Sequence, residues 1–156
     1  MNRLMLARHL RLILIGVALC GLLFYSSLLP AFLRECFPQE PHAVRVYLCF
    51  LLPSAIPCYL VLVFGWGIVR NIGRDRSFSQ ENARLLQRIS TLAAIDALYI
   101  FLGNPLLLLW GVGEWMFFLL ALMIVFVGVA VSVAAAALSH LVLRAAELQE
   151  QSDLTV

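Results

Sequence analysis

The stretch that decides the fold is residues 115–143, WMFFLLALMIVFVGVAVSVAAAALSHLVL, which holds no Asp, Glu, Lys or Arg. A helix needs roughly 20 apolar residues to cross a hydrocarbon core about 30 Å thick, and this run is longer. Three further apolar runs, at 12–33, 46–69 and 89–112, also reach that length. None shows the alternating pattern of a barrel strand, so we expect four transmembrane helices, which satisfy their own backbone groups in lipid.

The composition agrees with a membrane-embedded chain. Of its 156 residues, 63% are hydrophobic and 13% are charged, whereas soluble domains average about 45–50% and about 25%. A soluble fold would expose apolar patches that soluble monomers rarely carry. We therefore expect one all-α membrane domain over residues 1–156, a four-transmembrane-helix bundle whose main partner is the lipid bilayer.

The placement of arginine predicts the orientation, since the chain has no lysine. Nine arginines fall on one side of the spans: Arg3, Arg8, Arg11, Arg70, Arg74, Arg76, Arg84, Arg88 and Arg144. Two, Arg34 and Arg45, fall on the other. Short cytoplasmic segments carry the excess of basic residues, so both termini are expected in the cytoplasm.

The cytoplasmic loop, residues 70–88, reads RNIGRDRSFSQENARLLQR. Gly73 can end the second span, and Ser79 is a good N-cap for a helix that follows it. The pattern predicts a short amphipathic cytoplasmic helix between spans two and three, which lies at the headgroups and runs into the third span.

The cytoplasmic tail, residues 144–156, continues the fourth helix and then ends; it carries Glu147, Glu150 and Asp153. One interpretation is a solvated helix end that pairs loosely with the arginines of the loop. The other is a docking peptide, in which apolar Leu154 and Val156 are captured by strand addition or through a carboxylate nest.

Asp96 lies inside the third span, where an ionised side chain costs roughly 2.5–3.5 kcal/mol. Two interpretations stay open: a substrate, ion or proton site of a small transporter or channel subunit, or a buried polar contact that fixes helix packing. His140, near the cytoplasmic end of the fourth span, is a candidate partner for Asp96; alternatively, it reaches toward the interface.

Two further patterns concern packing. Pro53 and Pro57 lie four residues apart on one face of the second span and predict a kink there. Cys36 and Cys49 are expected at similar depth, and in an oxidising compartment they could form a disulfide.

Small residues recur at helical spacing in the fourth span, as Gly128 with Ser132 and Ala135 with Ser139. Such pairs allow close helix contact. The contact can lie within one bundle or between copies, so a homo-oligomer stays open.

The chain lacks the sequence patterns of chemistry: paired carboxylates, a nucleophile with a base, a metal-ligand cluster and a C-x-x-C spacing. We therefore expect a protein that is not an enzyme and that needs no cofactor or metal.

Two cytoplasmic motifs resemble those of a known family: RSFSQENARLLQRIS at 76–90 and AAELQEQSDLTV at 145–156. They are similar to the loop and terminal patterns of domain-of-unknown-function family twenty-nine seventy-five, small four-span proteins of the bacterial inner membrane. Its members are often encoded beside a small helix-turn-helix regulator of the Cro/repressor type. By association, the resemblance implies a membrane protein that binds and sequesters such a regulator, without binding nucleic acid directly.

The implied partner-binding residues belong to the loop and the tail. They are Arg74, Phe78, Glu81, Asn82, Arg84, Glu147, Leu148, Gln149, Asp153, Leu154, Thr155 and Val156.

Overall fold

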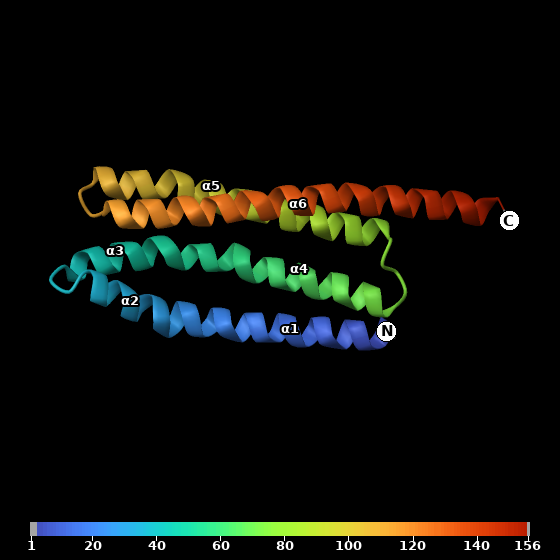
Figure 1. The fold of residues 1–156 in the computed structure, drawn as a ribbon, viewed down its shortest axis with the longest axis horizontal. Helices are drawn as coiled ribbons and strands as arrows, with labels where there is room; N and C mark the ends of the chain where they lie inside the picture. The colour runs from blue at the N-terminus through green and yellow to red at the C-terminus, as the bar shows by residue number, and fades with distance from the viewer. Residues whose placement is uncertain (1–2, 156) are drawn as a thin grey trace.

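Four long apolar helices form the protein (Figure 1), and the computed structural model describes residues 3–155. The candidate membrane spans are Leu4–Cys36, Pro41–Gly73, Gln80–Leu109 and Trp115–Leu154. The expected all-α protein with four spans is confirmed, and each helix begins before the apolar run that predicts it or extends beyond it. In the described residues the elements are α1 (Arg3–Leu23), a π-helical segment (Phe24–Leu28), α2 (Leu29–Cys36), α3 (Pro41–Leu51), a 3₁₀ turn (Leu52–Ser54), α4 (Ala55–Gly73), α5 (Gln80–Leu109) and α6 (Trp115–Leu154).

Prolines explain where the first two spans change helix type. Pro30 has no N–H to donate to the carbonyl four residues earlier, and just before it the Leu29 N–H bonds to the Phe24 carbonyl, an i to i+5 bond. In the second span the 3₁₀ turn contains Pro53, and Pro57 follows it. The second span therefore changes helix type at the place where the sequence predicts a kink.

Helix α4 packs on α1 and on α5, and α5 packs on α6, which crosses it along its length (Figure 1). A buried apolar cluster closes the bundle at the end that holds the α2–α3 turn. There the ring of Phe117, from α6, stacks on Phe37 at 5.3 Å and lies 5.0 Å from Tyr47, measured between ring centres. Elsewhere large apolar side chains face outward, as lipid allows; Phe126 is 75% exposed.

The small residues of the fourth span pack against α5 of the same chain. The Ser90 hydroxyl donates to the Ser132 carbonyl at 2.8 Å, and the Ser132 hydroxyl donates to the Ser90 carbonyl at 2.9 Å. A Cβ added to Gly128 would lie 3.1 Å from the Cβ of Ala97. This surface therefore makes a close contact inside the bundle.

Two further sequence-based expectations concern the helix after Ser79 and the cysteines. The helix predicted after Ser79 runs into the third span, because its residues are the first turns of α5, which continues without a break from Gln80 to Leu109. Its predicted N-cap is confirmed: the Ser79 hydroxyl accepts from the Asn82 N–H at 3.2 Å. Cys36 and Cys49, considered above as a disulfide pair, are free thiols.

Candidate functional site

Polar side chains gather in two places, at one end of the bundle and inside it. The first we call the arginine-rich end: the start of α1, the connection at 74–79 between α4 and α5, and the last turns of α6 (Figure 1). The second surrounds Asp96, in the middle of α5.

The connection at the arginine-rich end is held by two buried amides. The Asn71 side chain donates to the side-chain oxygen of Asn82 at 2.8 Å. The Asn82 nitrogen in turn donates to the carbonyls of Arg76 at 3.2 Å and Ser77 at 2.9 Å. Asn82 is 2% exposed, so it cannot touch a partner in this conformation. Asn82 therefore has a structural role, because its hydrogen bonds fix the loop at 74–79 between α4 and α5.

The last two turns of α6 project beyond the bundle (Figure 1). Ala146 is still buried, at 4% exposed, whereas every residue from 147 to 154 is exposed. We call residues 147–154 the projecting segment. It is helical up to Leu154, so capture of the tail by strand addition would first require unwinding. Val156, one of the implied partner-binding residues, lies outside the described residues.

Most of the other implied partner-binding residues are accessible at this end. Those on the loop side that are exposed are Arg74, Phe78, Glu81 and Arg84, and those on α6 and just after it are Glu147, Leu148, Gln149, Asp153, Leu154 and Thr155. The Gln80 side chain approaches Glu150 at 3.5 Å, which links the start of α5 to the projecting segment. The Thr155 hydroxyl donates to carbonyls of the preceding turn and so closes the helix end.

His140 lies with this end rather than with Asp96. It lines a groove of about 480 Å³ between α5 and α6, together with Gln80, Ala83, Arg84, Gln87, Ala136, Ser139 and Leu143. The Ser139 hydroxyl donates to the Ala83 carbonyl at 2.6 Å, which sets the register of the two helices. Ala83 precedes Asp96 by 13 residues on α5, roughly 20 Å along a helix. Of the two interpretations of His140, the contact with Asp96 is therefore wrong.

Asp96 instead meets the interruption of the second span. Its Oδ1 accepts a hydrogen bond from the Ser54 hydroxyl at 2.8 Å, and Ser54 ends the 3₁₀ turn. Beside it the Tyr25 hydroxyl lies 4.0 Å from the Cys58 sulfur. One turn along α5, the Tyr99 hydroxyl donates to the Phe50 carbonyl at 2.8 Å. This partly buried polar contact between helices is of the kind that the packing interpretation of Asp96 predicts.

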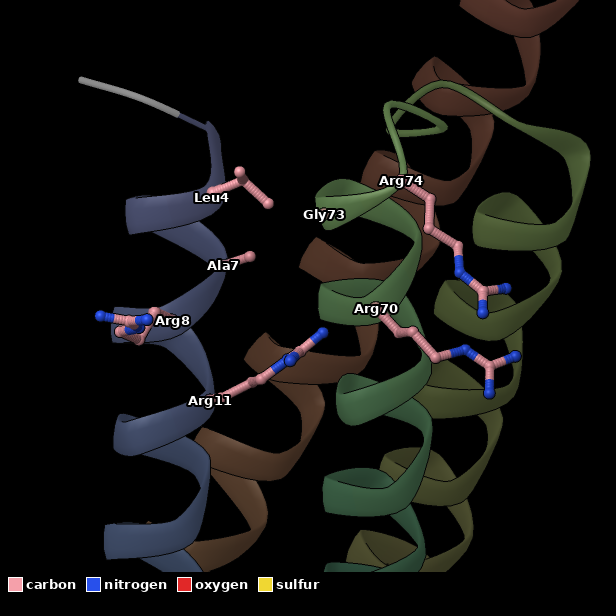
Figure 2. A pocket seen from close by; sticks show the side chains of 7 residues that line it. All are labelled: Leu4, Ala7, Arg8, Arg11, Arg70, Gly73 and Arg74. Atoms are coloured by element: carbon pink, nitrogen blue, oxygen red, sulfur yellow. The ribbon is translucent and has the colours of Figure 1, made fainter.

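A third feature was not found from the sequence: a cavity of about 470 Å³ between α1 and α4 at the arginine-rich end (Figure 2). Its lining is Leu4, Ala7, Arg8, Arg11, Arg70, Gly73 and Arg74. In the sequence, the distribution of these arginines indicates only the orientation of the spans. Arg8 and Arg11 lie three residues apart on α1, and Arg74 follows the end of α4, four residues after Arg70. Figure 2 shows Arg11 pointing toward α4, Arg8 pointing away from it, and Arg70 and Arg74 pointing away from α1. In residues 3–155 the structure brings together no three His, Cys, Asp or Glu side chains able to hold a metal ion.

Comparisons with known proteins agree with a membrane protein and leave its activity open. The chain is similar to the uncharacterized membrane protein YoaS of Bacillus subtilis (strain 168), with 26% identity over 148 residues, 93% of this chain and 92% of the relative. No solved structure matches it. Residues 7–156 match the family described as protein of unknown function (DUF2975), and the chain belongs to this family of still unassigned activity.

Proposed function

We propose that this chain is a membrane-embedded regulatory protein that docks a small helix-turn-helix transcription regulator at its arginine-rich end and so keeps it at the membrane. The supporting observation is the projecting segment. A helix that only spans the bilayer has no need to continue beyond its last buried residue, yet α6 continues for eight exposed residues after Ala146.

The chemistry of the projecting segment suits a basic protein partner. Glu147, Glu150 and Asp153 recur every three residues, so their carboxylates follow one side of the helix. DNA-binding proteins carry basic surfaces that meet phosphates, and a row of carboxylates complements such a surface. Binding there would compete with DNA, which is how docking would silence a regulator.

Apolar side chains on the same segment supply anchors. Leu148 is 66% exposed and Leu154 is 86% exposed, and Phe78 on the neighbouring loop is 60% exposed. Exposed leucines on a projecting helix can enter a groove of a partner, the usual way in which an amphipathic helix is recognised. The loop beside them is rigid, because Asn71 and Asn82 hold it, so little order would have to be gained on binding.

The proposal requires the arginine-rich end to face the cytoplasm, where transcription regulators are found. The excess of arginine at this end favours that orientation. With that orientation we expect this multi-pass protein, which has a bacterial relative, to lie in the inner membrane with both termini in the cytoplasm.

The test is a pull-down in mild detergent from native membranes, with co-purifying proteins identified by mass spectrometry. It compares the full chain with a chain that ends after Ala146. That position is chosen because Val142 and Ala146 are buried, at 8% and 4% exposed, so the shorter chain keeps its packing. We expect a small DNA-binding protein with the full chain and its loss from the truncated one. If both chains purify alone, the docking function fails.

A small transporter or channel subunit is the second candidate. It is favoured by the hydrogen bond of Asp96 to Ser54 at the interruption of the second span, because transporters place binding sites where helices are broken. Proton flux into proteoliposomes tests this candidate. Asp96→Asn would abolish the flux and leave any docked regulator bound, whereas wild-type liposomes without flux would exclude proton transport.

A further inference from the structure

Two grooves follow each other along the α5–α6 pair. The first, which we call the polar groove, is the one of about 480 Å³ that His140 lines at the arginine-rich end. The second, which we call the apolar groove, has a volume of about 370 Å³ and lies deeper in the spans. Its lining is Ala94, Ala97, Leu98, Phe101, Val125, Val129, Ser132 and Val133.

Helical periodicity places both grooves on one side of the helix pair. On α5, Gln87 of the polar groove and Ala94 of the apolar groove lie seven residues apart, and on α6 the same spacing joins Ala136 to Val129. Seven residues are about two turns, so each helix presents one face to both grooves. Asp96, two residues after Ala94 and so on the other side of α5, bonds to the second span. The grooves therefore open away from the rest of the bundle.

The polarity of the two grooves follows the order of groups in a phospholipid. The polar groove is lined by four side chains that can donate hydrogen bonds, which are Gln80, Arg84, Gln87 and His140. In the apolar groove Ser132 is polar, but its hydroxyl already donates to the Ser90 carbonyl at 2.9 Å. Among the described residues, neither lining contains a carboxylate. This side of the pair thus offers donors and a positive charge at the arginine-rich end, and hydrocarbon contacts farther in.

The length of the two grooves agrees with one leaflet of a bilayer. His140 and Val125 lie 15 residues apart on α6, which is about 22 Å along a helix. One leaflet, with its headgroups, is about 20–22 Å thick. A lipid whose phosphate lies beside His140 would therefore reach the far end of the apolar groove with its acyl chain.

We propose that the two grooves together bind one anionic phospholipid of the leaflet at the arginine-rich end. The guanidinium group of Arg84 can donate paired hydrogen bonds to phosphate oxygens, and the His140 ring can donate to the same group. One acyl chain lies in the apolar groove against the exposed side chains of Leu98 and Val129. Basic sites between transmembrane helices on the cytoplasmic side are of the kind that bind anionic headgroups.

A second copy of the chain is a poorer occupant of this surface. Copies in one membrane share their orientation, so a twofold contact here would bring the two polar grooves to the same level. Two Arg84 and two His140 side chains would then gather there, without a carboxylate in the described lining to offset them. An anionic headgroup supplies the charge that such a contact lacks.

Native mass spectrometry of the purified full chain in a non-ionic detergent measures the binding. The probes are phosphatidylglycerol and phosphatidylethanolamine with the same acyl chains. We expect one retained phosphatidylglycerol per chain and weaker retention of phosphatidylethanolamine; equal retention would overturn the anionic assignment. The inference goes beyond the docking function, and no regulator is present in the experiment, so the two can fail separately.

Arg84→Gln tests the polar groove. It should weaken phosphatidylglycerol binding about fivefold, the factor that one arginine contributes near an anionic surface. The matched control, Arg76→Gln, removes the same charge from an exposed loop residue outside both linings. It should bind within about twofold of the wild type. An equal loss in both variants would mean diffuse attraction and would overturn the site.

Ala94→Leu tests the apolar groove without changing the charge. Ala94 is exposed, so the larger side chain fills the groove and leaves the packing of the bundle intact. Binding should fall about tenfold, the loss expected when roughly two methylene groups of the acyl chain leave the groove. The control is Ala130→Leu, at an exposed position of α6 outside both linings, which should bind like the wild type. Unchanged binding by Ala94→Leu, with helicity preserved in circular dichroism, would overturn the proposal.

Two further outcomes would assign the surface to another occupant. A lipid-free dimer that Ala94→Leu dissociates would give it to a second copy of the chain. Displacement of phosphatidylglycerol by millimolar glycerol 3-phosphate, which has the phosphate without acyl chains, would reveal a free-anion site. Either result overturns the lipid assignment.

Discussion

Asn71 and Asn82 face each other across the connection of α4 and α5, with the amide nitrogen of Asn71 2.8 Å from the side-chain oxygen of Asn82. Both side chains are buried, at 3% and 2% exposed. The pair therefore sets the geometry of the loop without being part of its surface. Asn82, which the family resemblance implies as a partner-binding residue, therefore holds in place the loop that carries the exposed residues around it.

Asn82→Ala tests this support. It leaves the buried Asn71 amide without its acceptor, which costs about 1–3 kcal/mol of the free energy of unfolding. We expect faster trypsin cleavage after Arg74 and Arg76, measured by limited proteolysis in detergent. Gln87→Ala, an exposed amide on the same helix, is the control and should cleave at the wild-type rate. Equal rates for Asn82→Ala and wild type would show that the loop does not depend on the pair.

Gly128→Leu tests the close approach of α5 and α6. Even a Cβ at this position would lie 3.1 Å from Ala97, so a larger side chain must push the helices apart. We expect the free energy of unfolding to fall by about 1–3 kcal/mol, the usual cost of overpacking. Loss of helicity during titration with a denaturing detergent, followed by circular dichroism, measures it.

Gly16→Leu is the matched control for that experiment. A Cβ on Gly16 meets no atom within 4 Å, so the same substitution there should change stability by less than about 0.5 kcal/mol. If Gly128→Leu were equally harmless, the contact of α5 with α6 would be looser than the distances indicate.

The bond of Ser54 to Asp96 should be measurable by a double-mutant cycle. Ser54→Ala, Asp96→Ala and the double variant should give a coupling energy of about 1 kcal/mol, as for other hydrogen bonds between membrane helices. Asp96→Asn should keep most of the stability, because its carbonyl oxygen can still accept from Ser54. A coupling near zero would argue against this contact in the bilayer.

The orientation is open to labelling with a membrane-impermeant maleimide. In a chain whose four cysteines are replaced by alanine, Gln39→Cys should react in intact spheroplasts, and Ser152→Cys should react only after lysis. Both residues are exposed, at opposite ends of the bundle. The reverse pattern would put the arginine-rich end outside and remove the basis of the docking function.

Neutralising the acidic row of the projecting segment (Glu147, Glu150 and Asp153) tests the docking surface more specifically than truncation does. Neutralising it with Glu147→Gln, Glu150→Gln and Asp153→Asn should weaken capture of the regulator about tenfold, with about 0.5 kcal/mol lost for each exposed charge. Raising the salt concentration should weaken the wild-type complex in the same direction. The control neutralises Glu35, Glu40 and Glu114 to Gln; all three are exposed and away from the projecting segment. Equal capture by both triple variants would exclude the row as the contact.

The sequence by itself determined the four apolar spans, the irregular stretch of the second span near Pro53 and the cap at Ser79. Each depends on local properties: an apolar run long enough for the bilayer, a proline without an N–H, and a hydroxyl three residues before the N–H that it accepts. Only their exact limits changed, because polar turns such as 80–88 extend an apolar helix without contributing to its hydropathy.

Only the tertiary structure decided which residues meet. The register of α5 on α6, set by the hydrogen bond of Ser139 to Ala83, separates His140 from Asp96. The packing of the second span against α5 brings Ser54 within hydrogen-bond distance of Asp96. Arg11 and Arg70 line the same cavity, although they lie nearly 60 residues apart in the chain. Hydrophobicity places a helix in the membrane but leaves its rotation and its depth against each neighbour unspecified, and these are fixed by close packing and interhelical hydrogen bonds.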